Sequence, residues 1–296
     1  MFLWLVVFAQ VTTSAGSRPP ECGALDGGKA ANVWERAKAP ELRAYCDLLA
    51  SGASKLAGLQ GSPRDVLQIA DDADKKFPGK LAPSVLRGRA YERLRKYDDA
   101  FSTLAAVRTK DSSALEDAPA LLAFARAAVR TSHPKESFDA YSALLPRAVA
   151  LPASDRGPAY VEAGFVAMAR GPNGIDEAVA IFRQARKDAQ DSAQTIAWLG
   201  LALALDRAGS RDEARAVLGE RAKPDVKGAL ADSKTRDVLA PAFALESDAM
   251  LALALEATDV PGAHEAYKRY IDASGPTGTW TEQAKTADAS IGKRKR

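Results

Sequence analysis

Apolar side chains recur at helical spacing along most of the chain. Leu42, Tyr45, Leu49 and Leu56 follow one another at intervals of three, four and seven residues, which places them on one face of a helix. The run stops at Gly61-Ser62-Pro63, a sequence that ends one helix and can open the next. After position 12 the chain lacks the alternating β-branched runs that indicate strands. We therefore expect an all-α protein whose helices are joined by short turns.

The helical pattern repeats along the chain. Several Ala-rich helices open with two charged residues and a small one: Asp98-Asp99-Ala100, Lys135-Glu136-Ser137, Asp176-Glu177-Ala178 and Asp212-Glu213-Ala214. Each follows another helical stretch that ends in a short turn. This self-similarity is typical of stacked helical hairpins, in which no hairpin buries its apolar face alone. Such stacks mostly bind other molecules and rarely perform chemistry.

One stretch resembles a tetratricopeptide repeat (TPR). Gly88 and Tyr91 stand at the small and the large position of a first helix, and Ala100 and Leu104 follow on a second helix after a polar turn. The pattern recurs at Trp198, Leu201, Ala202, Leu205, Gly209 and Ala214. The resemblance covers about residues 40–290. It implies an α-solenoid, a right-handed superhelix of about six antiparallel hairpins with a C-terminal capping helix.

The repeat length is irregular. The residues taken as equivalent are Val66, Ala100, Ser137, Ala178, Ala214 and Ala263, at intervals of 34, 37, 41, 36 and 49. Only the first interval has the length that is typical of the family. The added residues fall at 171–174 and around 219–240, where we expect a loop or a short extra helix.

The N-terminus resembles an export signal. Residues 2–9 are apolar but too few to cross a bilayer, and Thr13-Ser14-Ala15 offers small residues for cleavage after Ala15. We expect a signal peptide at 1–15 and a linker at 16–39, where Pro, Gly and small residues indicate no regular structure. The usual basic residues before the apolar run are missing, so a buried first helix remains the alternative.

The chain has two cysteines, Cys22 and Cys46, both close to the expected signal peptide. An even count in an exported chain indicates a disulfide formed in an oxidising compartment. The bond would tie the entry segment to the first helix. Two unpaired, buried thiols are the alternative.

Charge argues against a nucleic-acid partner. The 41 basic and 38 acidic residues nearly cancel, with a net charge of +3, whereas nucleic-acid binders usually carry a strong basic imbalance on one face. The one basic run is the tail at 291–296. We interpret the tail as a solvated terminus, and weak attraction to an anionic membrane surface is the alternative.

No residue pattern indicates catalysis, a cofactor or a metal. His133 and His264 are the only histidines, and neither has the spacing that would build a zinc site with the cysteines. The carboxylates are many, but nothing singles out an acid/base pair. We expect a protein that is not an enzyme.

Four arginines are the candidate ligand site. Arg89 and Arg93 are one helical turn apart, and so are Arg126 and Arg130, 37 residues further on. Stacking would bring the two pairs side by side, and the family resemblance implies that they line the concave groove. Guanidinium groups there could bind an acidic peptide or a free C-terminal carboxylate, and Arg207 could extend the patch. The alternative is ordinary pairing with Glu92 or Asp117.

These features favour a non-catalytic scaffold that binds protein partners in the periplasm or cell envelope, or after secretion; the bacterial setting is implied by the resemblance. Three other functions stay open: an accessory protein held at peptidoglycan or membrane by the basic tail, a helical-toroid enzyme acting on an envelope polymer, and a cytoplasmic regulator.

Overall fold

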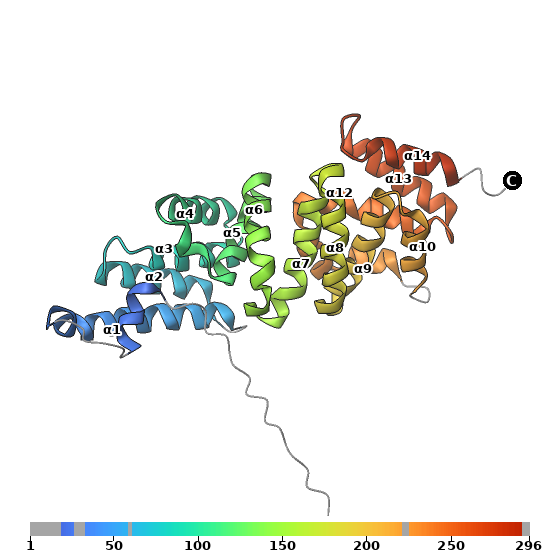
Figure 1. Ribbon diagram of the computed structural model, residues 1–296. Coiled ribbons are helices and arrows are strands. Elements are labelled where there is room, and N and C mark those ends of the chain that lie inside the picture. The colour runs from blue at the N-terminus through green and yellow to red at the C-terminus, as the bar shows by residue number, and fades with distance from the viewer. Residues whose placement is uncertain (1–18, 27–32, 59–60, 221–224, 292–296) are drawn as a thin grey trace, which may run out of the picture.

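The computed structural model describes residues 19–26, 33–58, 61–220 and 225–291. The expected signal peptide at 1–15 and most of the basic tail lie outside the described residues. In the described part the chain is helical and contains no strand. The expected all-α solenoid of stacked antiparallel hairpins is confirmed (Figure 1).

Six pairs of consecutive helices pack as hairpins in the described part of the chain. They are α1 (Val33–Ala57) with α2 (Pro63–Lys76), α3 (Leu81–Arg93) with α4 (Tyr97–Lys110), α5 (Ala118–Arg130) with α6 (Pro134–Leu144), α7 (Ala153–Met168) with α8 (Ile175–Asp188), α9 (Asp191–Arg207) with α10 (Arg211–Gly219), and α12 (Ser233–Leu255) with α13 (Val260–Ser274). Two further helices are α11 (Val226–Ala231) and the final α14 (Thr281–Ile291). Short 3₁₀ helices are η1 (Pro20–Asp26), η2 (Ser112–Leu115), η3 (Leu145–Ala150) and η4 (Gly171–Gly174).

Two segments differ from the sequence-based expectation. The segment 16–39, expected to lack regular structure, contains η1 and the start of α1, which begins at Val33. In the insertion around 219–240 the described residues contain α11, the short extra helix that was expected, but they also contain the start of α12. The α12 helix is long because it continues, without a break, from the insertion into the first helix of the last hairpin.

Small residues set the distance between neighbouring helices. A Cβ atom added at Gly88 would lie 2.5 Å from Cγ of Leu104, and one at Gly200 would lie 2.4 Å from a ring carbon of Phe182. Ala100 and the equivalent Ala214 are fully buried. The repeat pattern is therefore a packing requirement, because a larger side chain at these positions would force the helices apart.

Three of the turns between paired helices show the same backbone geometry. Arg95, Ser132 and Gly209 follow the first helices α3, α5 and α9, and each has a positive φ, of 59°, 61° and 82°. In each turn the next N–H bonds to the carbonyl five residues earlier, as in Lys96 to Tyr91. This is the Schellman motif, which satisfies the last carbonyls of a helix. The motif lies five residues before each of Ala100, Ser137 and Ala214, in agreement with the register predicted for these three hairpins.

The predicted disulfide between Cys22 and Cys46 is confirmed, with the two Cα atoms 5.9 Å apart. It fixes η1 against α1. The Tyr45 hydroxyl donates a hydrogen bond of 2.8 Å to Glu21 of η1, and its ring packs edge-on against Phe77 at the end of α2. The entry segment is thus joined to the first hairpin by a covalent bond, a hydrogen bond and buried apolar surface.

The stack is loosest between α6 and α7. The first helices of neighbouring hairpins, such as α3 and α5, pack along each other, but α5 hardly touches α7. We call this boundary the seam; it is the wide spacing between α6 and α7 in Figure 1. Contacts between α6 and α7 and through η3 cross it. Charged side chains also cross it, as described below.

Overpacking tests the hairpin contacts. Replacing the fully buried Ala100 or Ala214 with Leu should lower the free energy of unfolding by about 1–3 kcal/mol, because the added carbons have no space between the helices. Ala273→Leu is the matched control, since Ala273 is exposed on α13 and should change stability by less than about 0.5 kcal/mol. Urea unfolding measures both; equal effects at the buried and exposed sites would contradict this packing.

Reduction tests the role of the disulfide. Opening the bond across a sequence separation of 24 residues should destabilise the first hairpin by about 3 kcal/mol, because the unfolded chain gains freedom. Hydrogen exchange of α1 amides, with and without a thiol reductant, gives the measurement. In a Cys22→Ser, Cys46→Ser variant the reductant should have no effect. If α1 exchanges equally slowly in the reduced and oxidised wild type, the bond has no stabilising role.

Candidate ligand-binding site

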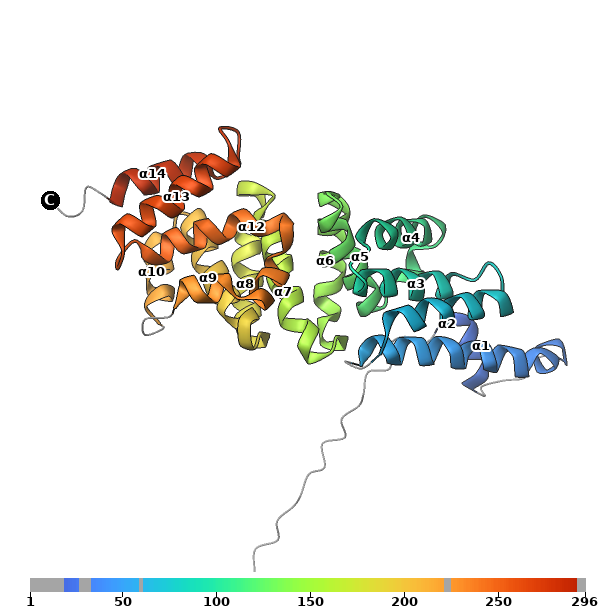
Figure 2. The ribbon, with the colours of Figure 1, turned by 180° about the vertical axis from the view of Figure 1, so that it is seen from behind.

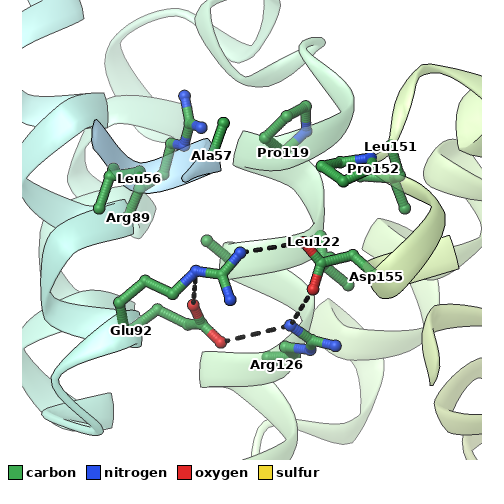
Figure 3. A pocket seen from close by; sticks show the side chains of 12 residues that line it. Leu56, Ala57, Arg89, Glu92, Pro119, Leu122, Arg126, Leu151, Pro152 and Asp155 are labelled. Carbon is green, nitrogen blue, oxygen red and sulfur yellow. Dashed lines mark hydrogen bonds and ion pairs between the residues drawn. The ribbon is translucent and has the colours of Figure 1, made fainter. Parts of the chain in front are cut away.

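A pocket lies at the seam, between the end of α1, the helices α3 and α5, and the start of α7 (Figure 3). Its apolar lining comes from Leu56, Ala57, Pro119, Leu122, Leu151 and Pro152. Its charged lining comes from Arg89, Glu92, Arg93, Arg126 and Asp155. Side chains that are far apart in the sequence therefore combine apolar surface with both signs of charge.

Arg126 is the centre of the charged group. Its Nε donates to both carboxylate oxygens of Glu162, at 2.9 and 3.2 Å. Its terminal nitrogen lies 3.7 Å from Glu92 and 3.6 Å from Asp155. Figure 3 shows Glu92, Arg126 and Asp155 directed toward one another. Arg126 thus connects three helices, because Glu92 lies on α3, Arg126 on α5, and Asp155 and Glu162 on α7.

These charged groups are buried, so they interact strongly with one another. The Glu162 side chain is 4% exposed and also accepts a hydrogen bond of 2.6 Å from the Tyr141 hydroxyl of α6. Burial would lower the pKa of Arg126, but the Glu162 and Glu92 carboxylates outweigh it and raise that pKa well above its usual value. Burial, followed by the negative charge of Glu162, raises the pKa of Tyr141. Arg126 is therefore a permanent cation that its surroundings already neutralise.

Arg93 and Arg89 have fewer or weaker polar contacts than Arg126. Arg93 is half-exposed, donates to Asp155 at 2.9 Å and lies 3.9 Å from Glu92. Among the described residues, Arg89 forms one ion pair, with Asp117 at 3.8 Å, a distance beyond hydrogen bonding. Burial lowers the pKa of Arg89, and Asp117 opposes the shift. Of the arginines at this site, Arg89 has the weakest polar contacts.

Arg130 is not part of the pocket lining. Its guanidinium lies over the Tyr97 ring, 4.9 Å from the centroid, and donates to the backbone carbonyls of Arg126 and Asp237, at 3.5 and 3.3 Å. Asp237 belongs to α12, and its carboxylate accepts a hydrogen bond of 2.9 Å from Arg95. The structure therefore brings together Arg89, Arg93 and Arg126, while Arg130 lies one helical turn beyond them.

Arg207 does not extend the patch as the sequence analysis expected. It is buried, donates to Glu246 at 2.5 Å and to the Tyr270 hydroxyl at 3.0 Å, and lies 5.0 Å from the Trp280 ring centroid. These partners come from the last hairpin and the segment before α14. Arg207 fastens the C-terminal end of the array, because a buried guanidinium needs nearby acceptors and aromatic faces.

The sequence analysis missed two of the acidic partners. It expected the arginines as donors to a ligand, with Glu92 or Asp117 as the alternative partners, but Asp155 and Glu162 escaped notice. Glu162 had a signal, because it stands alone in the buried run Val161–Met168, where an unpaired carboxylate is costly. Asp155 lies near the start of α7 and had none. With Glu92, Asp117, Asp155 and Glu162 present, the site has balanced charge and is not a basic patch.

No group of metal-binding side chains occurs within the described ranges. Over the same ranges, none of the helices has the length and apolar character needed to cross a bilayer. Neither observation identifies a second candidate site beside the pocket.

The chain was compared with known proteins. A scan against family models finds no match, and neither does a search of curated proteins. Similar solved structures include the MamA protein, at 18% identity over 66% of this chain and 93% of that one, with a TM-score of 0.42. They also include the APC/C hetero-tetramer Cut9-Hcn1, at 15% identity over 82% of this chain and 48% of that one, with a TM-score of 0.41.

A third is a thermophilic TPR protein in Thermus thermophilus, at 18% identity over 83% of this chain and 98% of that one, with a TM-score of 0.24. No functional conclusion follows from TM-scores below 0.5.

Glu162→Gln tests the pair across the seam. The variant keeps an oxygen for the Tyr141 hydroxyl but leaves the buried Arg126 without its nearest countercharge, and should lose about 3 kcal/mol of stability. Glu177→Gln is the matched control, because the Glu177–Arg170 pair is exposed and should contribute less than about 1 kcal/mol. Urea unfolding measures both, and equal losses would show that burial of the pair is unimportant.

Proposed function

We propose that the protein is a non-catalytic scaffold that binds a protein partner through the pocket at the seam. One observation carries the proposal: Arg89, Arg93 and Arg126 lie beside an apolar lining made by several helices. Stacked hairpins have no large closed core, and their extended surfaces commonly bind other chains.

The contacts divide the arginines by role. Arg126 is held by Glu162, Glu92 and Asp155 and serves as support. Arg89 has one long ion pair, and Arg93 is half-exposed. These two are the groups that can accept a ligand carboxylate, since a guanidinium presents five donors in a planar fork.

The lining of the pocket indicates which kind of partner would bind. A carboxylate on Arg89 would have Leu56, Ala57 and Pro119 nearby, so an apolar residue next to it would find a complementary surface. The partner is a protein or peptide with an acidic segment, or a free C-terminal carboxylate, beside an apolar side chain. It is not a nucleic acid, and the protein needs no cofactor for this role.

The proposed location is the bacterial periplasm, the cell envelope or the outside of the cell. The disulfide between Cys22 and Cys46 supports it, because such bonds persist in oxidising compartments. The short apolar segment at 2–9 supports export through a cleaved signal peptide. Association with a membrane surface through the basic tail would be a weak addition, and a cytoplasmic location would require the disulfide to be reduced.

Peptide binding tests the function. The probe is a fluorescent peptide ending in Asp-Glu-Leu, with a free C-terminus or an amidated one, measured by anisotropy at low salt. Arg89→Ala should weaken binding about tenfold or more, because a charged hydrogen bond is lost. Arg87→Ala is the matched control, since Arg87 also lies on α3 but pairs with Asp71 outside the pocket. Equal affinity in both variants, with the fold intact, would remove the pocket from the proposal.

A further inference from the structure

The first half of α12 covers helices that would otherwise face solvent. Every residue of α9 from Ile196 to Arg207 is buried, as is every residue of α7 from Val161 to Met168. A helix in a single layer of hairpins normally keeps one polar, exposed face. Here α12 packs on both α9 and α7, and Figure 2 shows it in front of the hairpins α7–α10.

The contact surface on α12 is a regular stripe. Thr235, Leu239 and Phe243 are all buried and are spaced by four residues, which places them on one face of the helix. The Phe243 ring stacks on Phe165 of α7, with centroids 5.4 Å apart. On the opposite side Leu245 remains 41% exposed. The segment Ser233–Leu245 therefore lies on the array as an amphipathic helix lies in a groove.

Its leading end crosses the seam. The Asp237 carboxylate accepts a hydrogen bond from Arg95, and its backbone carbonyl accepts one from Arg130. Arg95 follows α3 and Arg130 ends α5, so both belong to the N-terminal half of the array. The Asp237–Arg95 pair is largely exposed, and such pairs contribute little free energy. This end of α12 is held by contacts that can be exchanged for others.

The second half of α12 has separate contacts. Met250, Ala252 and Leu253 are buried, and Asp248 accepts a hydrogen bond of 2.8 Å from Arg269 of α13. This half forms the last hairpin with α13. The first half can therefore leave the array without dissolving that hairpin.

We propose that Ser233–Leu245 is an internal competitor of the partner, with Asp237 bonded to Arg95 through its carboxylate and to Arg130 through its backbone carbonyl. The proposal rests on the function proposed above. Arg130 lies one helical turn from Arg126, so an acidic partner that extends from the pocket along α5 meets Arg130 where Asp237 already lies. Partner binding and docking of this segment exclude each other. The segment thus occupies the surface at Arg130 until a partner with more acidic or apolar contacts displaces it.

Hydrogen exchange of the full chain tests the docked segment without any ligand. Asp237→Asn should speed exchange of the amides at 233–245 about two- to fivefold, because an exposed ion pair is lost. Phe243→Ala should speed it further, since the ring contact with Phe165 disappears. Asp248→Asn is the matched control and should leave these amides unchanged. Unchanged exchange in both Asp237→Asn and Phe243→Ala would overturn the proposal.

Competition is measured with the Asp-Glu-Leu peptide, extended by four acidic residues at its N-terminal end. Asp237→Asn should bind it about two- to fivefold more tightly than the wild type, and the peptide should speed exchange at 233–245 in the wild type. If the peptide binds but changes neither quantity, the segment does not compete. If it binds neither protein, the proposed function fails, while exchange without ligand still reports whether the segment is docked as described.

Discussion

The buried pair between Arg126 and Glu162 is the interaction on which the site depends. The helices α5 and α7, on either side of the seam, pack little against each other, and this pair joins them there. A buried ion pair is weak evidence for added stability, but breaking it leaves an unpaired charge in a region of low polarity. The two halves are therefore constrained to approach at one place and in one orientation. That approach brings the start of α7 to the pocket and places α12 beside Arg95 and Arg130.

In this arrangement some arginines support the fold, while others are available to bind a ligand. Arg126 has three acidic neighbours, so its charge is used within the fold. Arg89 has one distant partner and faces the apolar lining. The difference arises from position on α3 and α5 relative to α7, since all are arginines on first helices of their hairpins. A count of basic residues therefore overstates the surface available to a ligand.

Local pattern predicted much of the fold. Gly88, Ala100 and Ala214 lie at the tight helix contacts where the repeat pattern placed them, and Cys22 is bonded to Cys46. These features depend on near neighbours in sequence or on residue type alone. The position of α12 across α7 and α9 was not predicted, because the pattern of the insertion at 219–240 did not show which helices it would cover.

The polar contacts across the seam could not be predicted in the same way. Arg126 and Glu162 are 36 residues apart, and Arg95 and Asp237 are 142 apart. The separation of 36 residues is about one repeat, but the irregular repeat lengths do not fix which side chains meet, and no repeat interval links Arg95 to Asp237. Several carboxylates were available to each arginine, and only the relative placement of the hairpins selects among them.

The distance between two spin labels tests most directly whether the halves form one body. Labels on cysteines introduced at the exposed positions Ser102 on α4 and Lys187 on α8 would lie on opposite sides of the seam, and the native cysteines are already bonded to each other. Pulsed electron paramagnetic resonance should give a single, narrow distance distribution for the otherwise wild-type protein. A broad or double distribution would contradict a seam held by Arg126 and Glu162.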